Sequence, residues 1–135
     1  MKIIEISTDK NKLQIEVIHQ FLTTSYWAKG RTTDEVKKTI EHCLCFGVYL
    51  EGKQIGFARI ATDYTVFAYL MDVFILPEYR GKGYSKKLIQ TVIENPELQS
   101  CTVWMLKTAD AHGLYKQFGY TELKHPEKLM ERLLK

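Results

Sequence analysis

One segment of the chain brings together residue types that bind anions. Residues 77–87 read Pro-Glu-Tyr-Arg-Gly-Lys-Gly-Tyr-Ser-Lys-Lys and follow a long apolar run. Glycines let the backbone approach a ligand closely, and backbone N–H groups at the start of a helix attract negative charge. Residues 80–87 carry four cations and no acid, although the formal net charge of the whole chain is only +3. The pattern predicts a local cradle for a pyrophosphate; taken alone, it fits a basic loop with two turn glycines equally well.

The elements that would position this cradle follow from hydrophobic periodicity. Extended apolar runs predict strands over residues 2–6, 44–50, 54–61, 66–76 and 101–106, with closing strands over 120–123 and 128–134. Helical spacing predicts helices over residues 13–22, 33–43, 81–94 and 111–118, with Thr33 or Asp34 capping the second. The final segment, 128–134, suits a helix equally well.

The most apolar of these runs, residues 66–76, is expected at the centre of the sheet. Its only charged residue is Asp72, and a strand this apolar is normally covered on both faces. Ligands of mixed sheets with crossover helices gather beyond the carboxyl ends of the strands. The loop after Leu76 is therefore where we expect the site.

Length and composition exclude several classes of protein. A chain of 135 residues, 45% of them hydrophobic, suits a single domain over residues 1–135. Charges interrupt every apolar stretch well before the roughly 18 to 20 residues of a membrane-spanning helix. Cys43, Cys45 and Cys101 lack the spacing of a zinc site. We expect a cytoplasmic protein without a metal, a membrane partner or a nucleic-acid partner.

Two motifs in order resemble the GCN5-related N-acetyltransferase (GNAT) family. The first is residues 80–85, Arg-Gly-Lys-Gly-Tyr-Ser, which is similar to the family's [RQ]-x-x-G-x-[GA] cofactor motif except for Ser85. The second is residues 114–120, Leu-Tyr-Lys-Gln-Phe-Gly-Tyr, which lies about 30 residues later and is similar to the family's L-Y-x-x-x-G-[FY] segment. The resemblance implies an α/β (α+β) fold with a mixed, mostly antiparallel sheet of about six to seven strands and about four flanking helices.

The resemblance also implies acetyl-CoA as cosubstrate and assigns residues to it. The pyrophosphate would be held by residues of the first motif: Arg80, Gly81, Lys82, Gly83, Tyr84 and Ser85. The backbone of Phe74, Ile75 and Leu76 would pair with the pantetheine arm in the manner of an added strand. Thr108 stands where relatives often have an asparagine that touches the pantetheine. Tyr115 matches the tyrosine that protonates the departing thiolate; its alternative is a core aromatic.

The general base has two candidates in the sequence. Asp72 would be costly to bury unpaired, so it is either satisfied structurally or used at the site, with the structural use slightly favoured. His112, one helical turn before Tyr115, is the other. A covalent mechanism through Cys43 or Cys101 is disfavoured, because both cysteines lie in apolar surroundings typical of buried thiols.

The acceptor would bind against the loop between the first two expected helices. Tyr26, Trp27 and Arg31 lie there and could hold a substrate with a flat or cationic part and a carboxylate; equally, the aromatics could simply close the core. The predicted reaction is acetyl transfer to a small-molecule or peptide amine by direct attack, in a monomer or homodimer. The alternative is a non-catalytic CoA-binding module of the same fold.

Overall fold

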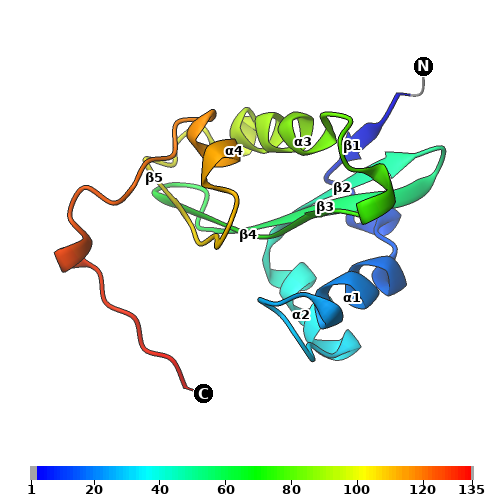
Figure 1. Ribbon diagram of the computed structural model, residues 1–135, viewed down its shortest axis with the longest axis horizontal. Helices are drawn as coiled ribbons and strands as arrows, with labels where there is room; N and C mark the ends of the chain where they lie inside the picture. Colours follow the sequence, from blue (N-terminus) through cyan, green and yellow to red (C-terminus); the bar gives the residue numbers. More distant parts are fainter. Residues whose placement is uncertain (1–2, 135) are drawn as a thin grey trace.

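The computed structural model describes residues 3–134, which form one mixed sheet with helices on both faces (Figure 1). Within this range the strands are β1 (Glu5–Ser7), β2 (Leu44–Leu50), β3 (Lys53–Thr62), β4 (Phe67–Ile75) and β5 (Val103–Leu106). The helices are α1 (Ile15–Thr24), α2 (Thr33–His42), α3 (Tyr84–Ile93) and α4 (His112–Lys116). Short 3₁₀ turns at Lys10–Lys12, Pro77–Tyr79, Pro96–Leu98 and Pro126–Lys128 join or follow them.

The strands follow each other in chain order across the sheet. β1 to β4 pair antiparallel, and β5 pairs parallel with β4 after the crossover through α3. The tight turn between β2 and β3 places Glu51 at φ +50° and Gly52 at φ +81°, the conformation that two-residue hairpins require.

Successive side chains along the strands point to opposite faces of the sheet, so the hydrophobic core has two parts. Cys45, Phe57 and Phe74 pack beneath α1 and α2, whereas their neighbours Phe46, Ala58 and Ile75 pack against α3. Successive side chains of a strand point to opposite faces, so both faces of the sheet are apolar and both are covered by helices. Figure 1 shows these two layers above and below the sheet.

β4 separates from β5 before it ends, and a bulge interrupts its pairing with β3. Arg59 pairs with Met71 and Phe57 pairs with Phe74, so Ala58 alone opposes Asp72 and Val73 in a β-bulge. On the other side, β5 pairs with β4 only as far as Leu70 and Leu106. The last residues of β4 therefore have a free edge, which opens the sheet at the carboxyl ends of these two strands.

The start of the first strand and the N-cap of the second helix differ from the sequence predictions. Of the expected strand over residues 2–6, Lys2 lies outside the described residues, and β1 begins at Glu5. The N-cap of α2 is Thr32, not Thr33 or Asp34, because Thr32 and Glu35 form a reciprocal capping box.

The expectation of six to seven strands is also wrong, since the described residues form five. Residues 120–123 and 128–134 form neither a strand nor an α-helix, because no neighbouring strand of this chain pairs with them. Consequently β3, rather than β4, occupies the middle of the sheet. Among residues 3–134, no helix is long and apolar enough to cross a membrane.

Candidate active site

A cleft of about 870 Å³ opens where β4 and β5 separate. Its walls come from the loop between α1 and α2, from β3 and β4, and from the segment that joins β5 to α4. The expected residues that line it are Tyr26, Trp27, Arg31, Asp72, Phe74, Ile75, Arg80, Ser85, Thr108 and Tyr115. Most of the residues chosen from the sequence are thus brought together around one space.

The glycine segment forms a separate hollow that adjoins this cleft. A hollow of about 180 Å³ is lined by Gly81, Gly83, Tyr84, Ser85 and Lys86, and it shares Arg80 and Ser85 with the larger cleft. Both glycines have φ +81°, and a Cβ at either would meet no atom within 4 Å. The positive φ requires glycine, and the open space lets a ligand reach the backbone.

The N-terminus of α3 faces this hollow with unused donors. The first hydrogen bond of the helix runs from Lys87 N–H to Gly83 O at 3.2 Å, so the N–H groups of the preceding turn have no partner within the helix. These donors, the helix dipole and the nearby cations fit an anion such as pyrophosphate. Lys82 does not line either space.

Arg80 is oriented by two contacts. Its Nε donates to the Ile75 carbonyl at 2.9 Å, and its guanidinium carbon lies 6.0 Å from the centre of the Phe21 ring. The guanidinium is therefore fixed between the cradle and β4, with its terminal nitrogens still available to an anion.

The free edge of β4 offers fewer backbone groups than the sequence predicts. Leu76 donates its N–H to Ile55 O at 2.8 Å and accepts from Tyr79 N–H at 2.9 Å, so neither of its groups is free. Because these groups alternate in direction along a strand, those of Ile75 face the cleft. The Phe74 side chain stacks on Phe21, with ring centres 4.1 Å apart. Ile75 is therefore the residue of the three whose backbone faces this edge.

Tyr115 lies on the wall of the cleft, on α4. Its side chain is buried, and its hydroxyl has no hydrogen-bond partner among the described residues. Burial raises the pKa of Tyr115 to about 12, with smaller contributions from Tyr26 and Asp110. The phenol therefore remains protonated at neutral pH and can donate a proton to a group in the cleft.

Two further expected residues shape the rim near α4. Thr108 accepts from Ala111 N–H at 3.0 Å, which holds the start of α4. The Tyr26 hydroxyl accepts from Ala109 N–H at 3.4 Å, which links the loop between α1 and α2 to the segment after β5. Tyr26 is mostly exposed, so it forms the lip of the cleft and is not part of the core.

Asp72 is held by three donors at the opposite end of the cleft. One carboxylate oxygen accepts from Trp27 Nε1 at 2.9 Å. The other accepts from Arg31 Nη1 at 2.7 Å and from Arg59 Nε at 2.8 Å. Asp72 is buried at φ +55° in the bulge, and this strain is held by the three contacts. The carboxylate therefore anchors the Trp27 and Arg31 side chains at this end of the cleft, which favours the structural use of Asp72 over the base.

The other candidate groups lie outside the cleft. His112 is exposed and does not line it. None of the three cysteines lines it either, and burial raises the pKa of Cys45 to about 12. Within residues 3–134, no group of three or more His, Cys, Asp or Glu side chains could hold a metal ion.

The chain matches the profile of the Acetyltransferase (GNAT) family over residues 14–120. It belongs to that family. A Gibberella zeae protein named as an acetyltransferase is 29% identical over 143 residues, which cover 88% of this chain and 80% of the relative.

Solved structures of GNAT acetyltransferases match the fold. One from Xanthomonas campestris pv. campestris is 46% identical, has a TM-score of 0.96, and covers 99% of this chain and 95% of its own. An acetyltransferase from Clostridium acetobutylicum, crystallised with acetyl-CoA, has a TM-score of 0.73 at 13% identity, and covers 99% of this chain and 97% of its own.

Sequence reasoning missed two residues of this GNAT site. Arg59 lines the cleft from β3, and Phe21 supports both Phe74 and Arg80 from α1. Arg59 is the only charged residue between Gln54 and Ala61, which is the same signal that drew attention to Asp72. Two opposite charges, each alone in an apolar strand, could have been read as a pair.

Proposed function

We propose that this protein transfers an acetyl group from acetyl-CoA to a primary amine by direct attack within a ternary complex. The observation that carries the proposal is the continuity of the cleft. One space is lined by Arg80 and Ser85 of the glycine cradle, by Tyr115, and by Trp27 and Arg31 of the loop between α1 and α2. Such a space has room for a pyrophosphate, an extended thioester arm and an acceptor.

Different residues of the cleft would bind the cofactor and transfer the proton. The N–H groups of α3 and the Arg80 guanidinium would hold the pyrophosphate. The outward N–H of Ile75, whose carbonyl already accepts from Arg80, would align the thioester arm. Acetyl-CoA supplies the activated acetyl group. As the new C–N bond forms and the C–S bond breaks, Tyr115 would give its proton to the departing sulfur. The nitrogen of the attacking amine would then lose a proton, and a water molecule would pass that proton to the Tyr115 oxygen, which restores the phenol. General acid help of this kind contributes on the order of 10² to 10⁴ in rate.

The acceptor is proposed to be a small molecule or a peptide that reaches the open end of the cleft. We further propose that residues 1–135 act as a single cytoplasmic domain that needs no metal and no nucleic acid.

Two measurements on the same protein test the proposal. Saturating acetyl-CoA should raise the melting temperature, because it binds the folded state alone. A thiol-release assay with acetyl-CoA should then detect turnover on at least one member of a broad amine panel. Cofactor-induced stabilisation without turnover on any amine would favour the non-catalytic CoA-binding module. Absence of stabilisation at saturating cofactor would refute both.

A further inference from the structure

The acceptor end of the cleft contains a buried guanidinium with few strong partners. Arg59 is 7% exposed, and only its Nε has an oxygen partner, on Asp72. Its Nη1 donates to Cys43 Sγ at 3.3 Å, and its Nη2 donates to Met71 Sδ at 3.7 Å. Thiol and thioether sulfurs are weak acceptors. A buried guanidinium therefore lines this space with two of its five N–H groups on weak sulfur acceptors and two without a partner among the described residues.

The charges around this group do not balance. Asp72 Oδ2 accepts from both Arg31 and Arg59, so one carboxylate faces two guanidinium groups. Their common acceptor holds the two guanidiniums side by side, and the Arg31 side chain retains 21% exposure toward the cleft. Uncompensated charge in a buried position costs several kcal/mol. An anion from the ligand would remove that cost and occupy the free donors.

We propose that the acceptor is an aminocarboxylate whose carboxylate binds Arg31 and Arg59, with its amine directed toward Tyr115. This inference rests on the proposed acetyl transfer and names the class of acceptor. A planar carboxylate suits a pair of guanidiniums, which can donate to both of its oxygens. The excess positive charge also lowers the pKa of a bound ammonium group, so it favours the neutral amine that attacks.

Matched acceptors test this selectivity in the thiol-release assay. The panel contains glycine, β-alanine, 4-aminobutyrate, L-phenylalanine and L-lysine, each beside its primary amide. We expect the best acid to exceed its amide by about 100-fold in kcat/KM, since hydrogen bonds to a charged group contribute about 1.5–3 kcal/mol each. Arg31→Gln should reduce this ratio to a few-fold. Lys29→Gln, which removes an exposed cation from the same loop, should preserve it.

A binding measurement separates this proposal from the proposed catalysis. The chain has two tryptophans, so Trp104→Phe leaves Trp27, whose Nε1 contacts Asp72, as the fluorescent reporter. With CoA saturating, phenylacetate should change the Trp27 emission at far lower concentration than phenylacetamide. That result supports the carboxylate site even if no amine turns over. Equal responses to acid and amide, in binding and in turnover, would overturn it.

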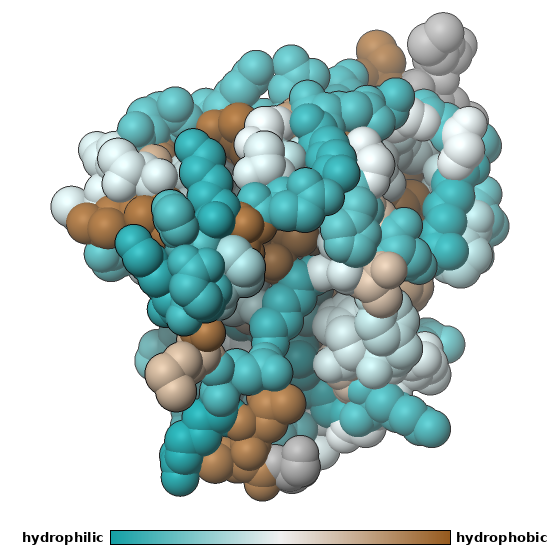
Figure 2. Space-filling view, turned by 60° about the vertical axis from the view of Figure 1, so that its left-hand side comes forward, coloured by the Kyte–Doolittle hydropathy of each residue, from teal (hydrophilic) through white to brown (hydrophobic). Residues whose placement is uncertain are grey.

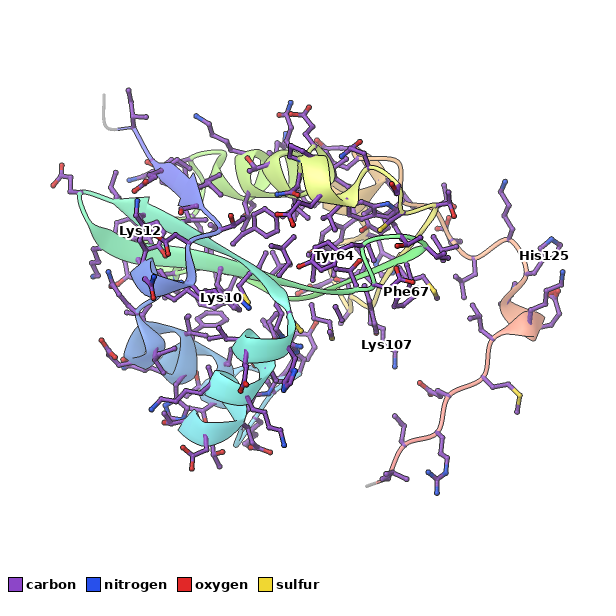
Figure 3. All side chains as sticks on the ribbon, turned by 180° about the vertical axis from the view of Figure 1, so that it is seen from behind. Lys10, Lys12, Tyr64, Phe67, Lys107 and His125 are labelled. Carbon is purple, nitrogen blue, oxygen red and sulfur yellow. The ribbon has the colours of Figure 1, made fainter. Side chains whose placement is uncertain are left out.

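The C-terminal tail, residues 121–134, leaves the body of the molecule (Figure 1), and Met130 within it is 97% exposed. Figure 2 shows hydrophobic side chains uncovered at the lower end of the molecule. Figure 3 shows His125 on the tail, well away from Phe67 and Tyr64 at the start of β4. Nothing in the described residues shows what covers these apolar side chains, so the tail carries no second inference.

Discussion

Tyr115 is a phenol held in a buried position on the wall of the cleft. Its pKa of about 12 keeps it protonated at the pH where an amine attacks, so its proton is available to the leaving sulfur. It lines the same cleft as Arg80 and Trp27, which agrees with that role. A purely structural role would depend on its ring, which packs edge-to-face against Tyr120 at 5.8 Å.

Tyr115→Phe separates these two roles, because it removes the hydroxyl and keeps the ring. We expect kcat to fall by about 10² or more, while the stabilisation by acetyl-CoA stays unchanged. Thiol release and a cofactor thermal shift measure the two effects. Unchanged turnover would reassign Tyr115 to the core. Tyr120→Phe is the matched control, since that hydroxyl is buried without a partner and does not line the cleft.

At the residue scale, the sequence indicated many of the residues that line the cleft but not how they pair with one another. The glycine spacing and the tyrosine segment could be recognised in the sequence, because each is a short motif of neighbouring residues. The contact of Arg59 with Asp72 depends on the register of β3 against β4 and on a bulge at Ala58. Nothing in the local pattern of either strand fixes that register, so the sequence left Asp72 open between a structural use, slightly favoured, and the general base.

At the scale of elements, α3 depends on the glycine that precedes it. Gly83 is the N-cap of α3 at φ +81° and ψ +8°, in the left-handed region. Alanine in this conformation costs of order 1–3 kcal/mol. Its Cβ would also project into the open space where we expect the pyrophosphate. Stability and cofactor binding should therefore fall together.

Gly83→Ala is expected to lower the free energy of unfolding by about 1 kcal/mol and to weaken CoA binding at least several-fold. Urea unfolding and a CoA titration measure these changes. Gly113→Ala is the matched control, because Gly113 lies within α4 at ordinary φ and also has open space around it. That control should be neutral or slightly stabilising. A Gly83→Ala protein that matches wild type in both measurements would remove the cradle from the cofactor site.

Most strands and helices could be predicted from the sequence, but the expected closing strands at the C-terminal end could not. Strands β2 to β4 and helices α1 to α3 each carry their own hydrophobic period, so their existence follows from the chain itself. A strand also needs a neighbour, which its own residues do not specify. Residues 128–134 have an extended apolar pattern but no partner in this chain, and the count of strands was therefore too high.

At the scale of the whole molecule, buried thiol and phenol groups determine how the free energy of unfolding changes at high pH. Burial raises the pKa of Cys45 from 9.0 to about 12, and it also raises the pKa of Tyr120 well above its ordinary value of 10.0. The unfolded chain would lose these protons near the ordinary values, while the folded chain retains them. Proton release thus favours unfolding, and the stability present below about pH 9 is lost as the pH rises toward 12.

The free energy of unfolding should accordingly be level up to about pH 8.5 and fall increasingly steeply above it. Each such group contributes about 1.4 kcal/mol per pH unit beyond its unfolded pKa. Tyr120→Phe removes one of them, together with a buried hydroxyl that has no partner, so the variant should lose stability less steeply above pH 10. Urea titrations from pH 7.5 to pH 11 measure both slopes. An identical decline in the two proteins would mean that the Tyr120 phenol ionises as readily in the folded chain as in the unfolded one.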